Sequence, residues 1–132
     1  MIVDASALVA ILKGEPEAER FTERVVSESA KISAANWLEA AMVADGSGDP
    51  AAGDNLDRIV ATAEIDVVPV TAEQASFARL AFRRFGRGSG AGARLNFGDC
   101  FAYALSVTSG EPLLFKGDDF RQTDVLPAEP GA

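Results

Sequence analysis

Residues 2–12 read IVDASALVAIL and decide the fold, because a short apolar run ends in Asp4 and passes at once into a helical pattern. The apolar pair before Asp4 predicts a strand, and the residues after the capping-type Ser6 predict a helix that continues to Leu12. Asp4 would therefore lie at the carboxyl end of a first strand. In parallel α/β sheets, functional sites lie outside this end of the strands.

The same alternation of strand and helix continues along the chain. Residues 67–70 are typical of a buried strand, and Thr71 can cap the long helix that follows it. The other expected strands are 32–33 and 113–115, and the other expected helices begin at Pro16 or span 37–43, 55–63, 72–85 and 96–106. Strands that alternate with helices predict an α/β fold with a central parallel sheet flanked by helices.

The chain has 132 residues, 48% of them hydrophobic, which is enough for one domain with a buried core, so we expect a single domain over residues 1–132. Its Pro/Gly-rich residues from about 127 are expected to be loose. The single cysteine, Cys100, excludes an intrachain disulfide and a cysteine-based zinc site. Without a signal peptide or an apolar run of roughly 20 residues, the sequence predicts a soluble cytoplasmic protein with no membrane segment.

Acidic residues stand at predicted edges of strands and helices along the whole chain: Asp4, Glu39, Asp99, Asp118 and Asp119. The chain has no histidine, so a hydrolytic site here has neither a histidine base nor a histidine metal cage. Clustered carboxylates would act through a hard cation such as Mg²⁺ or Mn²⁺, which points towards a phosphate substrate. Taken singly, Asp99 can instead be a helix cap and Glu39 an exposed helical residue. Both adjoin strongly apolar segments, where an acid needs a partner, either a cation or an arginine.

The formal net charge of −8 argues against indiscriminate binding of nucleic acid. The chain nevertheless has a basic segment between Glu73 and Asp99, which contains no acid and holds Arg79, Arg83, Arg84, Arg87 and Arg94. This segment is either a solvated helix face or a contact surface for phosphate. The glycine-rich residues 86–92 inside it lack the Gly-Lys-Ser/Thr ending of a phosphate-binding loop and predict a mobile surface loop.

Four stretches together carry a resemblance to a known family: Asp4-Ala5-Ser6, Glu39 in a helix after a short strand, residues 95–104 (LNFGDCFAYA) and residues 113–120 (LLFKGDDF). The pattern covers residues 1 to about 126 and resembles the PIN-domain ribonucleases, specifically the VapC toxins of bacterial toxin-antitoxin pairs. The resemblance implies a three-layer α/β/α domain with a central parallel sheet, and cleavage of RNA that depends on Mg²⁺, with Mn²⁺ as a substitute. It also implies a homodimer and inhibition by a cognate VapB-type antitoxin.

The resemblance also assigns roles by position. Asp4 and Asp99 match the central metal ligands, Glu39 a third acid and Asp119 the fourth, while Ser6 matches a hydroxyl that orients water or the acids. Asp118 is left as a supporting residue, and Asp124 is close enough in sequence to support the metal ligands. The arginines at 79, 83, 87 and 94 are candidates for contact with RNA or with the antitoxin.

Two other functions stay open at this point. A receiver-like or haloacid-dehalogenase-like phosphotransfer domain also places acids at strand ends, but the latter would need a second aspartate two residues after the first, where this chain has Ser6. A catalytically silent PIN-like binding module would keep the fold without turnover, and metal-dependent turnover separates it from the enzyme.

Overall fold

Four short parallel strands form the centre of the computed structural model, which describes residues 1–130. The strands are β1 (Ile2–Val3), β2 (Lys31–Ser33), β3 (Asp66–Val68) and β4 (Leu113–Leu114), in the order β3-β2-β1-β4. The first strand is central, because Ile2 is in register with Lys31 on one side and with Leu113 on the other. Both residues of β1 are fully buried, as expected for a parallel strand covered on both faces.

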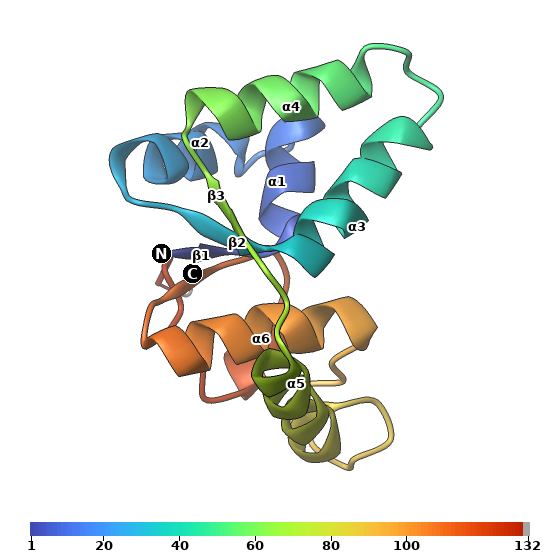
Figure 1. Cartoon of the computed structure of the whole chain (residues 1–132), viewed down its shortest axis with the longest axis vertical. Helices are drawn as coiled ribbons and strands as arrows, with labels where there is room; N and C mark the ends of the chain where they lie inside the picture. The colour runs from blue at the N-terminus through green and yellow to red at the C-terminus, as the bar shows by residue number, and fades with distance from the viewer. Residues whose placement is uncertain (131–132) are drawn as a thin grey trace.

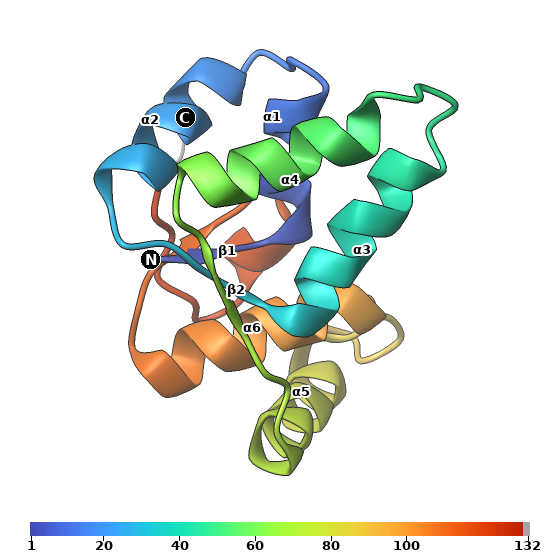
Figure 2. The same cartoon turned by 45° about the horizontal axis from the view of Figure 1, so that its top comes forward.

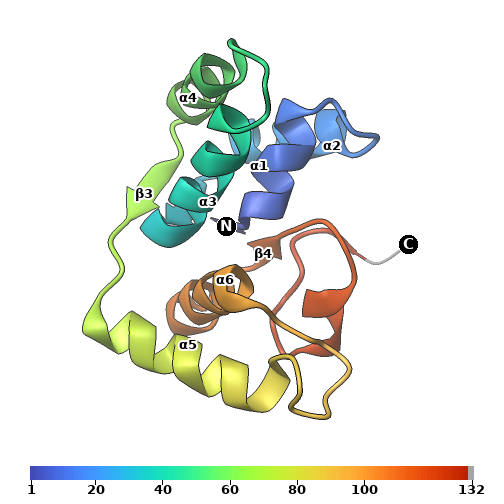
Figure 3. The same ribbon diagram turned by 90° about the vertical axis from the view of Figure 1, so that its right-hand side faces the viewer.

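Helices cover both faces of this sheet, so the predicted three-layer α/β/α architecture is confirmed (Figure 1). The helices are α1 (Ala5–Leu12), α2 (Ala18–Ser27), α3 (Ala34–Asp45), α4 (Ala52–Thr62), α5 (Ala72–Phe85) and α6 (Phe97–Ser109). The first four lie on one face, and α5 and α6 lie on the other (Figures 1 and 3). Each face has its own hydrophobic core, with Leu8, Val25 and Ile32 in one and Leu95, Tyr103 and Leu113 in the other.

Side-chain caps fix where the helices begin. Asp4 caps α1, because its Oδ2 accepts the Ser6 N–H at 3.0 Å, so the expectation that Ser6 opens this helix is wrong. Ser33 caps α3, which therefore begins at Ala34 and not near residue 37. Thr71 caps α5 as predicted. Asp4 directly follows β1 and Ser33 is the last residue of β2, so α1 and α3 begin at the same edge of the sheet.

The strand at residues 67–70 was expected to be buried, and this expectation is wrong. β3 ends at Val68 and is the edge strand of the sheet, and Val67 is 38% exposed. A local apolar run does not reveal strand order, and a strand at the edge has a neighbour on one side only.

The end of the described chain is more ordered than its composition suggests. The Ala128 N–H donates to the Leu113 carbonyl at 2.8 Å, and Pro127 forms an isolated parallel bridge with the same residue. The Glu129 carboxylate pairs with Arg20 and Arg24 of α2. Residues 127–130 are thus held against the outer side of β4, contrary to the prediction that they are loose, while residues 131 and 132 lie outside the described part. Across residues 1–130, no helix is long and apolar enough to cross a membrane.

Candidate functional site

The carboxyl ends of β1 and β4 are tied together where the first acid lies. The Asp4 N–H donates to the Leu114 carbonyl at 2.9 Å, and the Lys116 N–H donates to Ser6 Oγ at 3.0 Å. Asp4 therefore sits at the strand end that the sequence predicted. Ser6 bridges the start of α1 to the loop after β4, a contact that joins residues 110 positions apart.

The Asp4 carboxyl group is buried and only partly compensated. The residue is 3% exposed, and its Oδ1 has no hydrogen-bond partner among residues 1–130. Burial raises the pKa of Asp4 to about 7, although the hydrogen bonds with Ser6 lower it. The charges of Asp99 and Glu39 raise this pKa further, which places both acids within electrostatic reach of Asp4.

Asp99 is both a helix cap and a member of this acidic group. It is the third residue of α6, where its Oδ2 accepts the Asn96 N–H at 3.0 Å while Asn96 Oδ1 accepts the Asp99 N–H at 2.9 Å. Burial is nonetheless the largest influence and raises the pKa of Asp99, with further increases from the charges of Glu39 and Asp119. The predicted cap is therefore confirmed, and capping does not exclude a role in the site.

Glu39 reaches the same group from α3. Its Oε1 accepts a hydrogen bond from Asn36 Nδ2 at 3.3 Å, and the same Nδ2 donates to the Gly98 carbonyl at 2.9 Å. A side chain at Gly98 would collide with the Glu39 carboxylate. Sequence reasoning missed Asn36 and Gly98, although an amide three residues before an acid in a helix was a local signal.

The acids of the last loop separate into three environments. Asp119 begins the short 3₁₀ helix η1 (Asp119–Gln122), and its charge raises the pKa of Asp99, so it joins the group. Asp118 is exposed and lines a different hollow beside Arg121. Asp124 accepts the Tyr103 hydroxyl at 2.5 Å and pairs with Arg84 at 3.5 Å. Asp124 thus has partners away from the four acids, contrary to the suggestion that it supports them.

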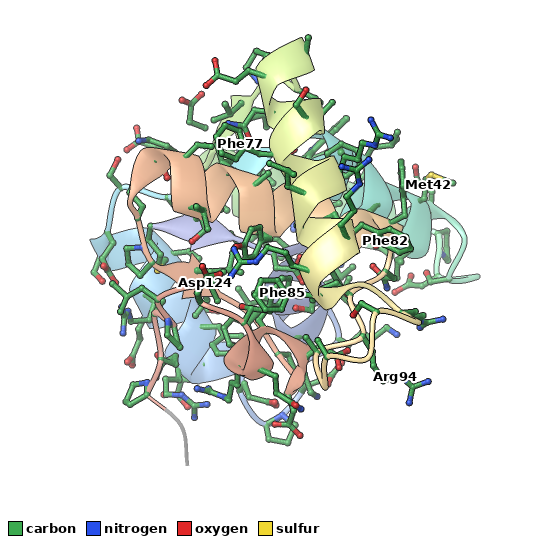
Figure 4. The ribbon with its side chains drawn as sticks, turned by 90° about the horizontal axis from the view of Figure 1, so that it is seen from below. Met42, Phe77, Phe82, Phe85, Arg94 and Asp124 are labelled. Atoms are coloured by element: carbon green, nitrogen blue, oxygen red, sulfur yellow. The ribbon has the colours of Figure 1, made fainter. Side chains whose placement is uncertain are left out.

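The arginines of the basic segment do not form one surface. Arg87 faces the acids, because its charge lowers the pKa of Asp99. Arg79 and Arg83 are exposed one turn apart on α5, whereas Arg84 pairs with Asp124. Arg94 points away from the body of the protein at the edge of the loop after α5 (Figure 4). Among these arginines, Arg87 is the one whose charge lowers the pKa of Asp99.

The oxygen atoms of the four acids, Asp4, Glu39, Asp99 and Asp119, are of the kind that a hard divalent cation prefers. The group offers carboxylate oxygens, and one of them, Asp4 Oδ1, is buried without a partner in the described part of the chain. Within residues 1–130, no three or more acids or cysteines lie together in an arrangement that could hold a metal ion between them. Mg²⁺ does not need such an arrangement, since it commonly keeps several waters and binds through one or two carboxylates. The residues thus fit such an ion.

Comparisons with known proteins agree with this arrangement. The PIN domain family matches residues 1–126. The chain is 47% identical to VapC ribonuclease Mb0625 of Mycobacterium bovis and to ribonuclease VapC28 of Mycobacterium tuberculosis, over 95% of each chain. It is 48% identical to ribonuclease VapC of Mycolicibacterium smegmatis, over 95% of this chain and 97% of the relative.

Two solved structures share the fold at low sequence identity. The sarcin-ricin-loop-cleaving toxin VapC20 of Mycobacterium tuberculosis superposes with a TM-score of 0.77 at 17% identity, over 98% of both chains. A toxin-antitoxin complex from Klebsiella pneumoniae gives a TM-score of 0.67 at 17% identity, over 90% of this chain and 88% of that one. The family match and the mycobacterial relatives show that this chain belongs to the PIN-domain family and, within it, to the VapC ribonucleases.

Proposed function

We propose that this protein is a metal-dependent endoribonuclease and the toxin of a VapBC-type toxin-antitoxin pair. The observation that carries the proposal is a chain of electrostatic coupling among the acids: the charges of Glu39 and Asp99 raise the pKa of the buried Asp4, and the charge of Asp119 raises the pKa of Asp99. The chain is also 47% identical to named VapC ribonucleases. A scaffold would gain nothing from this coupling, because like charges near a buried acid destabilise the fold.

The proposed roles follow from the positions of the side chains. Asp4 and Asp99 would hold the cation, with Glu39 and Asp119 completing the acidic group. Mg²⁺ or Mn²⁺, when bound, lowers the pKa of water and offsets the phosphate charge. Ser6 Oγ already accepts the Lys116 N–H, so its own hydroxyl proton is left to donate to a water or to an acid. Arg87 would face the phosphate from the other side of Asp99.

Metal binding is expected to raise the melting temperature of the protein. Mn²⁺ at 100 times its dissociation constant should add about 2.7 kcal/mol of stability, or roughly 5–10 °C, because it relieves repulsion among the acids. Asp4→Asn and Asp99→Asn should abolish the shift, and Asp57→Asn, which removes an exposed acid of α4, should retain it. Differential scanning calorimetry with Mn²⁺ or chelator measures this, and a full shift in both site variants would contradict the proposed ligands.

RNA binding is expected to depend on Arg87. Replacing Arg87 with Ala should weaken RNA binding and lower the slope of log affinity against log salt by roughly 0.7–0.9, the value for one lost phosphate contact. Lys13→Ala, at the exposed end of α1, removes the same charge elsewhere. Fluorescence anisotropy with single-stranded RNA at several salt concentrations checks this. Equal slopes of log affinity against log salt for the parent and the Arg87 variant would show that Arg87 does not contact an RNA phosphate.

The helices α1, α2 and α4 lie on the same face of the sheet (Figure 2), and a groove between their side chains supports the antitoxin as partner. It has a volume of about 370 Å³ and an apolar lining that includes Ile11, Leu12, Val25 and Ile59. An apolar segment of the antitoxin would lie there, as amphipathic helices do in such grooves, and a basic side chain following it would approach the acids. The Klebsiella neighbour, a toxin-antitoxin complex, is in keeping with this partner.

An exposed apolar surface supports the homodimer. Phe97 is 80% exposed, and with Phe101 it borders two apolar hollows, one beside Phe82 of α5 and one beside Met42 of α3. Phe82 and Met42 lie on the same flank of the molecule (Figure 4). Contiguous apolar surface of this kind on a protein usually marks an interaction site, and we assign it to a second copy of the chain.

A further inference from the structure

Asn36 is a buried polar side chain whose position the fold alone does not explain. The buried polar residues of the described chain are Asp4, Ser33, Asn36 and Ser106. Ser33 caps α3, and Ser106 donates to the Glu111 carbonyl near the end of its own helix. Asn36 is different, because its amide reaches across to another helix and also contacts Glu39.

The orientation of the Asn36 amide is determined by its partners. The Gly98 carbonyl and Glu39 Oε1 are both acceptors, so the NH₂ group must face them. The carbonyl oxygen of Asn36 is then left buried with no partner among residues 1–130. An unsatisfied buried acceptor destabilises a fold, and an apolar side chain of similar volume would avoid this. Stability therefore does not account for an amide at this position.

Gly98 is unfavourable for a similar reason. It is the second residue of α6, where alanine would form the helix better, and its backbone does not have the positive φ that favours glycine. What glycine provides is space, because a Cβ atom there would overlap both carboxylate oxygens of Glu39. Two locally unfavourable residues on different helices thus meet at the same carboxylate.

We infer that Asn36 and Gly98 are positioning residues, which together hold the Glu39 carboxylate against the first turn of α6, beside Asp99. The inference rests on the proposed function, since it assigns the two residues to the same site. Asn36 holds one oxygen of Glu39 by a hydrogen bond, and Gly98 leaves the room that the group occupies. The amino end of α6 also favours a negative charge. Without these two residues, the half-buried Glu39 side chain would be free to turn its carboxylate away from Asp99.

The test compares variants of the two positioning residues, Asn36 and Gly98, with one matched control. Asn36→Leu removes the amide, and Gly98→Ala fills the space. The control is Gly53→Ala in the first turn of α4, where a Cβ would approach the exposed Asp45 carboxylate instead. In both Asn36→Leu and Gly98→Ala we expect kcat for RNA cleavage to fall about 10- to 100-fold, with KM unchanged within about two-fold. Isothermal titration should show Mn²⁺ binding weakened about 10-fold or more, while Gly53→Ala matches the parent in all three quantities.

A rescue separates positioning from general damage to the fold. Glu39→Asp shortens the acid by one methylene and withdraws its carboxylate from Gly98, so adding Gly98→Ala to it should cost less than about two-fold in kcat. Multiplicative losses in the double variant would overturn the inference, as would parent-like kcat and Mn²⁺ affinity in Asn36→Leu. If Asn36→Leu does not fold, Gly98→Ala and its rescue decide. If the parent protein cleaves no RNA, the proposed function fails, and the Mn²⁺ affinities still decide the positioning: equal values overturn it and weakened values support it.

Discussion

Purified protein with Asp99→Asn should leave total cellular RNA intact, under Mg²⁺ or Mn²⁺ conditions in which the parent protein produces discrete new 5′ and 3′ ends. We expect the rate of cleavage to fall by roughly 10²–10³-fold or more, because the substitution removes one of the two carboxylates that would hold the proposed cation. The fold should survive, since the amide oxygen of asparagine can still accept the Asn96 N–H in the cap of α6. Sequencing of RNA ends measures both the rate and the target.

Two controls make this experiment decisive. Chelator should abolish RNA cleavage by the parent protein. Asp57→Asn should cleave RNA like the parent, because it removes an exposed acid of α4, on the opposite face of the sheet from α6. If discrete ends appear equally with the parent and with Asp99→Asn, the acidic group is not the active site. If no ends appear under any metal condition with antitoxin-free protein, the chain is a silent PIN-like binding module.

The second large effect concerns stability in the absence of metal. Here the removal of an acid is expected to be a gain, in stability, whereas in the first prediction it is a loss, in activity. The pKa of Asp4 is raised from 3.8 to about 7, so the folded state holds this proton more tightly than the unfolded state does. The contribution of Asp4 to stability should therefore be most favourable at acidic pH, become less favourable as the pH rises from about 4 to about 7, and stay low above it. A shift of this size corresponds to about 4 kcal/mol, which Asp4→Asn would recover at pH 8.

The measurement is thermal unfolding with chelator across this pH range. At pH 8 the melting temperature of Asp4→Asn should exceed that of the parent by about 10 °C, and near pH 4 the two proteins should agree. Asparagine can keep the cap of α1, because its oxygen can accept the Ser6 N–H. Asp57→Asn provides the baseline for an exposed acid. Parallel pH profiles for the parent and Asp4→Asn would mean that Asp4 is not strained by burial.

Together these results would show that the acids of the site lower stability while they support activity: removing the Asp99 carboxylate costs activity, and removing the Asp4 carboxylate gains stability in the absence of metal. Natural active sites often have this property, because charges gathered for a ligand repel one another in its absence. It would also explain why a cation stabilises the fold so strongly.

Much of the site was predictable because the acids occupy positions that local sequence defines. Asp4 follows an apolar strand, and Asp99 stands three residues after Asn96 in a capping pattern, so both positions follow from short-range rules. The parallel sheet then brings strand ends to one edge. By contrast, Asn36 acts on Gly98, 62 residues away, and only the packing of α3 against α6 creates that contact.

The incorrect expectations have a similar origin. Asp124 lies close to Asp119 in sequence, yet the turn of η1 carries it to Tyr103 and Arg84. The exposure of Val67 depends on strand order, and the anchoring of Ala128 depends on its pairing with β4. Each of these outcomes is set by tertiary contacts that no local pattern encodes.

The distribution of the acids along the chain has a consequence for how the protein is made. Asp4 is synthesised before the other three acids, and Asp119 is synthesised last, 115 residues after it. β1 also lacks its β4 neighbour until Leu113 and Leu114 have been made. A nascent chain still attached to the ribosome, which is itself built of RNA, therefore has no complete acidic group for most of its synthesis. A polypeptide released at any point before η1 would lack Asp119, and under the proposed mechanism it would not cleave the RNA of the ribosome that made it.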